Sequence, residues 1–135
     1  AFEECADLAV VQFKDKVSVG AQAFRACKNL TDLSFTITGL EIQSFEGCSS
    51  LRTVNIEANI EERCVRVFAD CTSLEEVTIT GKNIAIGAEF FAGCTSLKKA
   101  FITDTGTGNG VVLSSAFTAP TQTIEVYLNV PETFL

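Results

Sequence analysis

Apolar residues recur along this chain with a fixed period. A phenylalanine is followed three residues later by a cysteine, and three residues after that by a leucine. This unit occurs five times, as Phe2-Cys5-Leu8, Phe24-Cys27-Leu30, Phe45-Cys48-Leu51, Phe68-Cys71-Leu74 and Phe91-Cys94-Leu97. The copies begin 22, 21, 23 and 23 residues apart. Self-similarity at a period of this length predicts a solenoid in which each repeat forms one coil.

Each copy continues with an alternating segment. The third and fifth residues after the leucine are apolar, and this period of two predicts a strand with one buried face. These pairs are Val11 and Phe13, Leu33 and Phe35, Val54 and Ile56, Val77 and Ile79, and Ala100 and Ile102. The spacing of phenylalanine and cysteine predicts one helical or 3-10 turn. Short apolar pieces at 17–19, 40–42 and 84–86 are candidates for a second strand on the opposite wall.

A sixth, degenerate copy follows the fifth. It begins at Phe117, and Val126 and Leu128 lie nine and eleven residues beyond, the same offsets as the apolar strand positions of the first copy. Pro120 and Thr123 occupy the places of cysteine and leucine. Loss of core residues at one end of a repeat array is typical of a terminal repeat.

Segments 23–30 and 68–79 closely resemble BspA-type leucine-rich repeats, which occur in bacterial surface proteins, treponemal ones among them, and in some protozoa. The resemblance covers residues 1 to about 103 and, more weakly, the rest. It implies an α/β-type solenoid dominated by β: an arc with a parallel sheet on the concave face, short helical or 3-10 turns, and five full repeats plus one degenerate. The asparagine consensus of other leucine-rich repeats and the proline that often follows the strand in this family are missing.

At 135 residues the chain is expected to be one domain, 1–135, whose repeats act as a single stack. The expected repeats lie near 1–22, 23–43, 44–66, 67–89, 90–115 and 116–135. The chain opens in mid-repeat without a methionine, so we expect a processed or trimmed product.

Composition argues against several function classes. The net charge is −7, with ten basic residues and no basic run, which disfavours nucleic-acid binding. No stretch approaches the roughly 20 apolar residues of a membrane helix. The chain has no histidine, and no carboxylate is placed by sequence beside a nucleophile, so we expect neither an enzyme nor a cofactor. The glycine-rich run 104–110 is expected to be a loop.

Five of the six cysteines occupy one position of the repeat and should stack into an inward ladder. The spacing of coils, about 4.7–4.9 Å, lies near the Cα separations that disulfides accept, but buried thiols are the favoured reading. One cysteine per coil gives no cluster of metal ligands. Cys64 lies outside the pattern and is either an exposed reactive thiol beside Arg63 and Arg66 or a misaligned core residue.

The outward face of the strands holds the candidate binding residues. Alternation places one column at Gln12, Ser34, Asn55, Thr78, Phe101 and Tyr127, and a neighbouring column includes Asp32, Glu76 and Lys99. Most are small or polar, but Phe101 and Tyr127 are aromatic, and rings on a polar surface are common anchors of protein interfaces. The alternative is that the sixth coil shifts register and buries one ring, because a slip of one residue exchanges the two faces of a strand.

These features favour a non-catalytic protein–protein interaction module. The family resemblance implies an adhesin-like role toward a host or other partner protein, on a bacterial surface, in the periplasm or outside the cell. The alternative is a self-assembling scaffold with homotypic interfaces, which could enclose an apolar surface for a hydrophobic ligand. Uncapped terminal coils expose their core, so we expect a homo-oligomer or further residues that cap the stack. Buried reduced cysteines would also be compatible with the cytoplasm.

Overall fold

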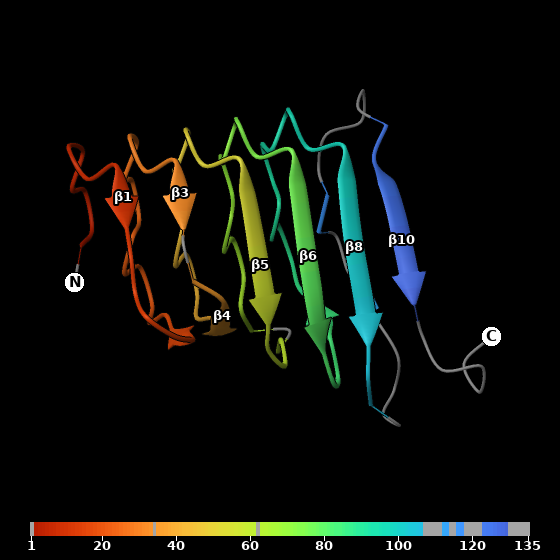
Figure 1. Cartoon of the computed structure of the whole chain (residues 1–135). Coiled ribbons are helices and arrows are strands. Elements are labelled where there is room, and N and C mark those ends of the chain that lie inside the picture. The colour runs from red at the N-terminus through yellow and green to blue at the C-terminus, as the bar shows by residue number, and fades with distance from the viewer. Residues whose placement is uncertain are drawn as a thin grey trace.

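The computed structural model describes residues 2–33, 35–61, 63–106, 112–113, 116–117 and 123–129. Across these residues the chain winds as successive coils whose strands lie side by side in parallel (Figure 1). The main sheet has the order β10-β8-β6-β5-β4-β2. Its strands are β2 (Val17–Ser18), β4 (Ile37–Gly39), β5 (Thr53–Glu57), β6 (Glu76–Gly81), β8 (Lys99–Asp104) and β10 (Glu125–Asn129). The architecture is the predicted parallel β-solenoid.

The strand register follows the repeat offsets from the third coil onward. Val54 pairs with Val77, Val77 with Ala100, and Ala100 with Val126. Burial alternates along β5 and β6, with the apolar residues inward and the polar residues outward. The sixth coil therefore continues the ladder in the register that its offsets predict.

Two small sheets complete the described strands. β1 (Val10–Val11) pairs with β3 (Asp32–Leu33), and β7 (Ala85–Ile86) pairs with β9 (Val112–Leu113). The expectation of a second strand on the opposite wall is therefore only partly correct. Segment 84–86 contributes to a separate sheet, but Val17–Ser18 joins the main sheet, and 40–42 forms no strand.

The second and third coils are offset relative to the simple repeat alignment. That alignment places Phe35 beside Ile56, whereas the structure pairs Ile37 with Ile56, two residues further along. Because side chains alternate with a period of two, a shift of two residues keeps every side chain on its expected face. Phe35 and Ile37 are accordingly both buried.

The segment from phenylalanine to leucine forms tight turns. The amide of Cys27 donates to the carbonyl of Phe24, and the amide of Leu30 donates to the carbonyl of Cys27, each at 3.2 Å. These i to i+3 hydrogen bonds are the predicted single turns, and no helix is formed by the described residues.

Each turn also contains residues with left-handed backbone geometry, which the sequence analysis did not predict. The second residue after the phenylalanine has a positive φ in every complete repeat, at Glu4 (59°), Ala26 (60°), Gly47 (76°), Asp70 (58°) and Gly93 (72°). A second positive-φ position precedes the phenylalanine, at Gln22, Gln43, Arg66 and Glu89. The amide of Ala26 donates to the backbone carbonyl of Glu46 in the next coil at 2.7 Å, so the turns form a backbone ladder of their own.

The core is a stack of equivalent side chains. Phe2, Phe24, Phe45, Phe68, Phe91 and Phe117 stack in sequence, with ring centroids 5.3 to 5.9 Å apart and interplanar angles of 7° to 13°. The thiols of Cys27, Cys48, Cys71 and Cys94 each donate to the carbonyl of the phenylalanine in the preceding coil, at 3.0 to 3.2 Å. All six cysteines are free, and five of them are buried, as favoured from the sequence. Cys5 of the first coil is exposed, so the prediction of an inward thiol is wrong at that position.

Cys64 is a core residue. Its side chain is 3% exposed, and its thiol donates to the carbonyl of Leu40 at 3.2 Å. Burial raises the pKa of this thiol. The alternative of an exposed reactive thiol is wrong, because the longer segment before the fourth repeat folds Cys64 into the stack.

Candidate functional site

The outward residues of the four long strands lie in two rows across the sheet. In the first row, Asn55 pairs with Thr78, Thr78 with Phe101, and Phe101 with Tyr127. In the second, Glu76 pairs with Lys99, and Lys99 with Glu125. The structure therefore brings together six of the nine residues selected from the sequence: Asn55, Glu76, Thr78, Lys99, Phe101 and Tyr127.

The remaining three candidates belong to the first two coils. Gln12 and Asp32 are both exposed, and Asp32 pairs with Val10 in the small sheet of β1 and β3. No pairing joins this small sheet to the six-stranded sheet among the described strands. Ser34 lies outside the described residues. The candidate face is therefore continuous from β5 to β10, and the small sheet of β1 and β3 is not paired with it in the described part of the chain.

Phe101 and Tyr127 form an exposed aromatic pair. The ring centroids are 4.9 Å apart, and the planes differ by 11°. The residues are 37% and 48% exposed, so the register shift that would bury one of them is wrong. The hydroxyl of Tyr127 donates to the carboxylate of Glu125, and this hydrogen bond raises the pKa of the tyrosine. The strand register of β8 and β10 thus sets the two rings in the stacked geometry that aromatic side chains favour.

The described surface has shallow hollows. One of about 370 Å³ is formed by the facing residues of β8 and β10, including Phe101 and Tyr127. Another, of about 470 Å³, lies near the ends of the strands and is lined by Glu57, Asn59 and Lys82 among others. In the part of the chain that the structure describes, no group of three or more cysteine, aspartate or glutamate residues converges to hold a metal ion.

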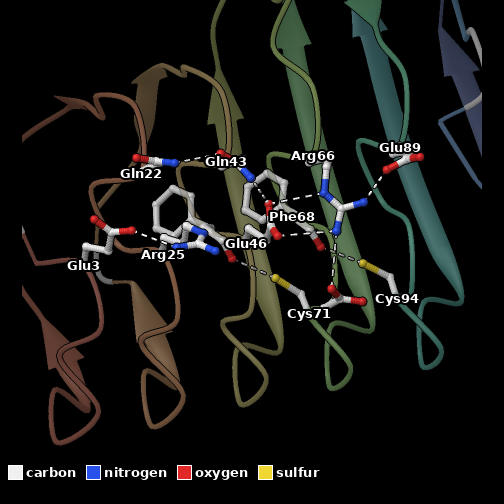
Figure 2. Close-up of polar contacts among 12 residues, drawn as sticks. Glu3, Gln22, Arg25, Gln43, Glu46, Arg66, Phe68, Cys71, Glu89 and Cys94 are labelled. Atoms are coloured by element: carbon white, nitrogen blue, oxygen red, sulfur yellow. Dashed lines mark hydrogen bonds and ion pairs between the residues drawn. The ribbon is translucent and has the colours of Figure 1, made fainter.

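A polar network lies along the side of the solenoid formed by the turns around the repeated phenylalanines, which we call the turn wall. The sequence analysis did not predict this network. Arg66 forms ion pairs with Glu46 and Glu89 (Figure 2) and with Asp70. These three carboxylates flank the stacked rings of Phe45, Phe91 and Phe68, respectively. The hydrogen bonds that Arg66 donates to Glu46 and, with a smaller effect, to Glu89 raise the pKa of Arg66. Gln43 also donates to Glu46, at 2.7 Å. The charged groups are paired with one another, so this network holds adjacent coils together.

The network has a recognisable sequence signal. Gln22, Gln43, Arg66 and Glu89 occupy the same repeat position, two residues before the phenylalanine. In the structure these side chains interact from coil to coil, as Gln22 does with Gln43 at 2.8 Å (Figure 2). A column of long polar residues at one repeat position therefore indicates side chains that pair along the stack.

Comparison with known proteins identifies the repeats. The family model for the BspA type leucine rich repeat region matches six copies over residues 1–122. Searches of curated proteins and of solved structures returned no match. No helix long and apolar enough to cross a membrane occurs within the described ranges. With the repeated turns, the parallel strand ladder and the stacked phenylalanines all in register, this match shows that the chain belongs to the BspA-type leucine-rich repeat family.

Proposed function

We propose that the chain is a non-catalytic module that binds a partner protein through the strand face around Phe101 and Tyr127. Membership of a leucine-rich repeat family indicates a protein-interaction module. Repeat proteins bind through the extended surface that their stacked coils create. The observation that carries the proposal is the exposed, stacked ring pair on a face whose other members are polar.

The geometry of the pair suits an interface anchor. The two rings already stack at 4.9 Å, so binding would cost little side-chain entropy. Thr78, which pairs with Phe101, continues the same row as an exposed polar residue and would form part of the rim beside the rings. Truncation of an anchor residue typically costs about 2 kcal/mol or more, which corresponds to a roughly 30-fold loss of affinity.

The test is capture of bacterial and host surface proteins by immobilised wild-type protein and by the variants Phe101→Ala and Tyr127→Ala. Asn55→Ala is the matched control, because Asn55 is exposed in the same row but lies two strands away from Phe101 and three from Tyr127. Both ring variants should lose the captured partner, and the control should retain it. Capture that is unchanged in both folded ring variants would refute the role of the pair.

The finer role is adhesin-like, with binding to a host protein outside a bacterial cell. This rests on the kind of protein in which such repeats occur. Detection of the native protein in surface or secreted fractions would support this location. Recovery only in the cytoplasmic fraction would refute it.

A second candidate is a self-assembling scaffold. Its support is the exposure of apolar residues at the two ends of the stack, where Phe2 is 41% exposed and Leu128 is 52% exposed. An exposed terminal coil tends to associate with another coil. A pull-down that recovers only copies of the chain, together with a mass above the monomer at low concentration, would favour this role over partner binding.

A further inference from the structure

Strand β10 has one edge that no described strand covers. Its other edge pairs with β8, and the amide of Glu125 donates to the carbonyl of Lys98 at 2.8 Å. In a parallel ladder the N–H and C=O of one residue point to the same edge, and the next residue points to the other. The peptide groups of Val126 and Leu128 therefore point away from β8, toward the open edge.

The side chains at this edge are also incompletely covered. Val126 and Leu128 align with the buried residues Ala100 and Ile102, yet they are 37% and 52% exposed. Tyr127 covers Phe101 with one face of its ring, and the opposite face is directed along the stack toward the open edge. The edge thus combines backbone groups that point away from β8, two apolar side chains and one aromatic face.

Charge alternates toward the edge. Glu76 lies beside Lys99, and Lys99 lies beside Glu125, which is the last residue of that row in the described strands. Opposite charges on neighbouring strands stabilise a sheet, and like charges destabilise it. A strand added beside β10 would therefore be favoured with a basic residue opposite Glu125.

We propose that this edge binds an extended segment of a partner protein as an additional parallel strand. Opposite Glu125, Val126, Tyr127 and Leu128, the segment carries a basic, an apolar, an aromatic and an apolar residue. Main-chain hydrogen bonds supply affinity in this mode of binding, and alternate side chains supply specificity. The inference rests on the proposed interaction role and adds to it the class of segment that is bound.

The chain's own first coil is a poorer occupant. Its strand reads Val10-Val11-Gln12-Phe13, which provides apolar residues at the second and fourth positions. In the same register it places Val10 opposite the carboxylate of Glu125 and Gln12 opposite the ring of Tyr127. A second copy would therefore lack both the cation and the ring that the edge favours.

The experiment uses a capped peptide with the order Lys-Val-Phe-Val-Thr and a scrambled control, Val-Phe-Lys-Thr-Val. Tyr127 is the only tyrosine of the chain, which has no tryptophan, so its fluorescence reports on the edge directly. The ordered peptide should change this fluorescence and bind at least about tenfold more tightly than the scrambled one, the equivalent of one good side-chain contact. Absence of binding to the folded protein, or equal binding of both peptides, would overturn the proposal.

Two variants test the geometry. Leu128→Pro removes an N–H that points to the open edge and leaves the groups that pair with β8 in place, since edge strands tolerate proline. This variant should lose peptide binding. Glu125→Lys should reverse the preference, so that a peptide with glutamate in place of lysine binds more tightly. Unchanged binding in Leu128→Pro, or an unchanged preference in Glu125→Lys, would refute the edge mode.

The outcomes separate this proposal from the face-binding function. If Leu128→Pro loses the peptide but still captures the partner through the rings, the partner uses the face alone and the edge proposal fails while the proposed function stands. If Phe101→Ala still binds the peptide and still captures the partner, the face proposal fails and the edge proposal stands. The protein alone could also self-associate, so that its mass in solution rises with concentration. If Leu128→Pro abolishes this self-association, the edge binds a second copy, and the proposal is overturned.

Discussion

Replacing Phe68 with alanine should cost more stability than replacing Phe2, although both residues occupy the same repeat position. Phe68 is fully buried and stacks on Phe45 at 5.3 Å and on Phe91 at 5.9 Å. Phe2 is 41% exposed and stacks on Phe24 at 5.3 Å. The difference tests whether each coil is stabilised by its neighbours on both sides, as expected for a solenoid.

The magnitudes follow from burial. Truncation of a buried phenylalanine costs about 3–5 kcal/mol, and the ring contacts on both sides of Phe68 place it at about 4–5 kcal/mol. Phe2 loses a ring that is partly in water and has one stacked neighbour, so about 2 kcal/mol is expected. With a urea dependence of roughly 2 kcal/mol per molar, Phe68→Ala should lower the unfolding midpoint by about 2 M and Phe2→Ala by about 1 M.

Urea unfolding followed by far-ultraviolet circular dichroism measures both losses. A domain of this size has a stability of roughly 5–15 kcal/mol, so Phe68→Ala is close to the limit of folding. The leucine variants Phe68→Leu and Phe2→Leu provide a milder pair in which the same order should hold. Equal losses at the two positions, in either pair, would show that the stacked rings do not account for the stability.

Three further predictions concern the turns, the polar network and the thiols. Ala26→Gly should stabilise the fold by about 0.5–1 kcal/mol in urea unfolding, because φ is 60° there, and Gly47→Ala should destabilise it similarly. Arg66→Ala should cost about 1 kcal/mol in low salt and less at 1 M salt, where ion pairs are screened. Burial raises the pKa of Cys48 and Cys94 from 9.0 to about 12. As the pH rises, these thiols ionise in the unfolded chain before they ionise in the folded one. Their contribution to the free energy of unfolding is therefore fully present below about pH 9 and is lost between about pH 9 and pH 12. Each alanine variant should make the fall of the free energy of unfolding with pH shallower by up to about 1.4 kcal/mol per pH unit.

The stack of coils could be predicted because its core positions need apolar residues, and these residues recur at fixed intervals in the sequence. Phenylalanine, cysteine and leucine recur at positions that are buried in the second to the fifth repeat. The offsets of Val126 and Leu128 likewise predicted the register of the sixth coil, since a period of two leaves each strand only one way to bury its apolar face. The pairing of Ile37 with Ile56 could not be predicted, because a shift of two residues satisfies the same alternation.

The backbone conformation and the polar contacts of the turn wall could not be predicted, for a different reason. Its left-handed residues include Ala26 and Asp70, which carry no signal comparable to that of glycine. The hydrogen bonds from thiols such as Cys71 to the preceding coil could not be predicted either, because a cysteine at a core position of the repeat indicates only a small apolar side chain. The column that contains Arg66 did carry a signal, but its side chains meet only once the coils are stacked (Figure 2).

The two walls of the solenoid differ in how freely they can change. On the turn wall, ion pairs at the surface join one coil to the next, and the stacked rings and thiol hydrogen bonds beneath them do the same in the core. A substitution on this side therefore alters the contacts between coils. On the strand wall, residues such as Asn55 and Thr78 are exposed, and substitutions at exposed positions usually change stability by less than about 0.5 kcal/mol. The backbone ladder still holds their spacing fixed, which is why Phe101 and Tyr127 stack at 4.9 Å without support from the core. A binding surface can therefore vary on this wall at little cost to the fold, and the aromatic pair lies where such variation is expected.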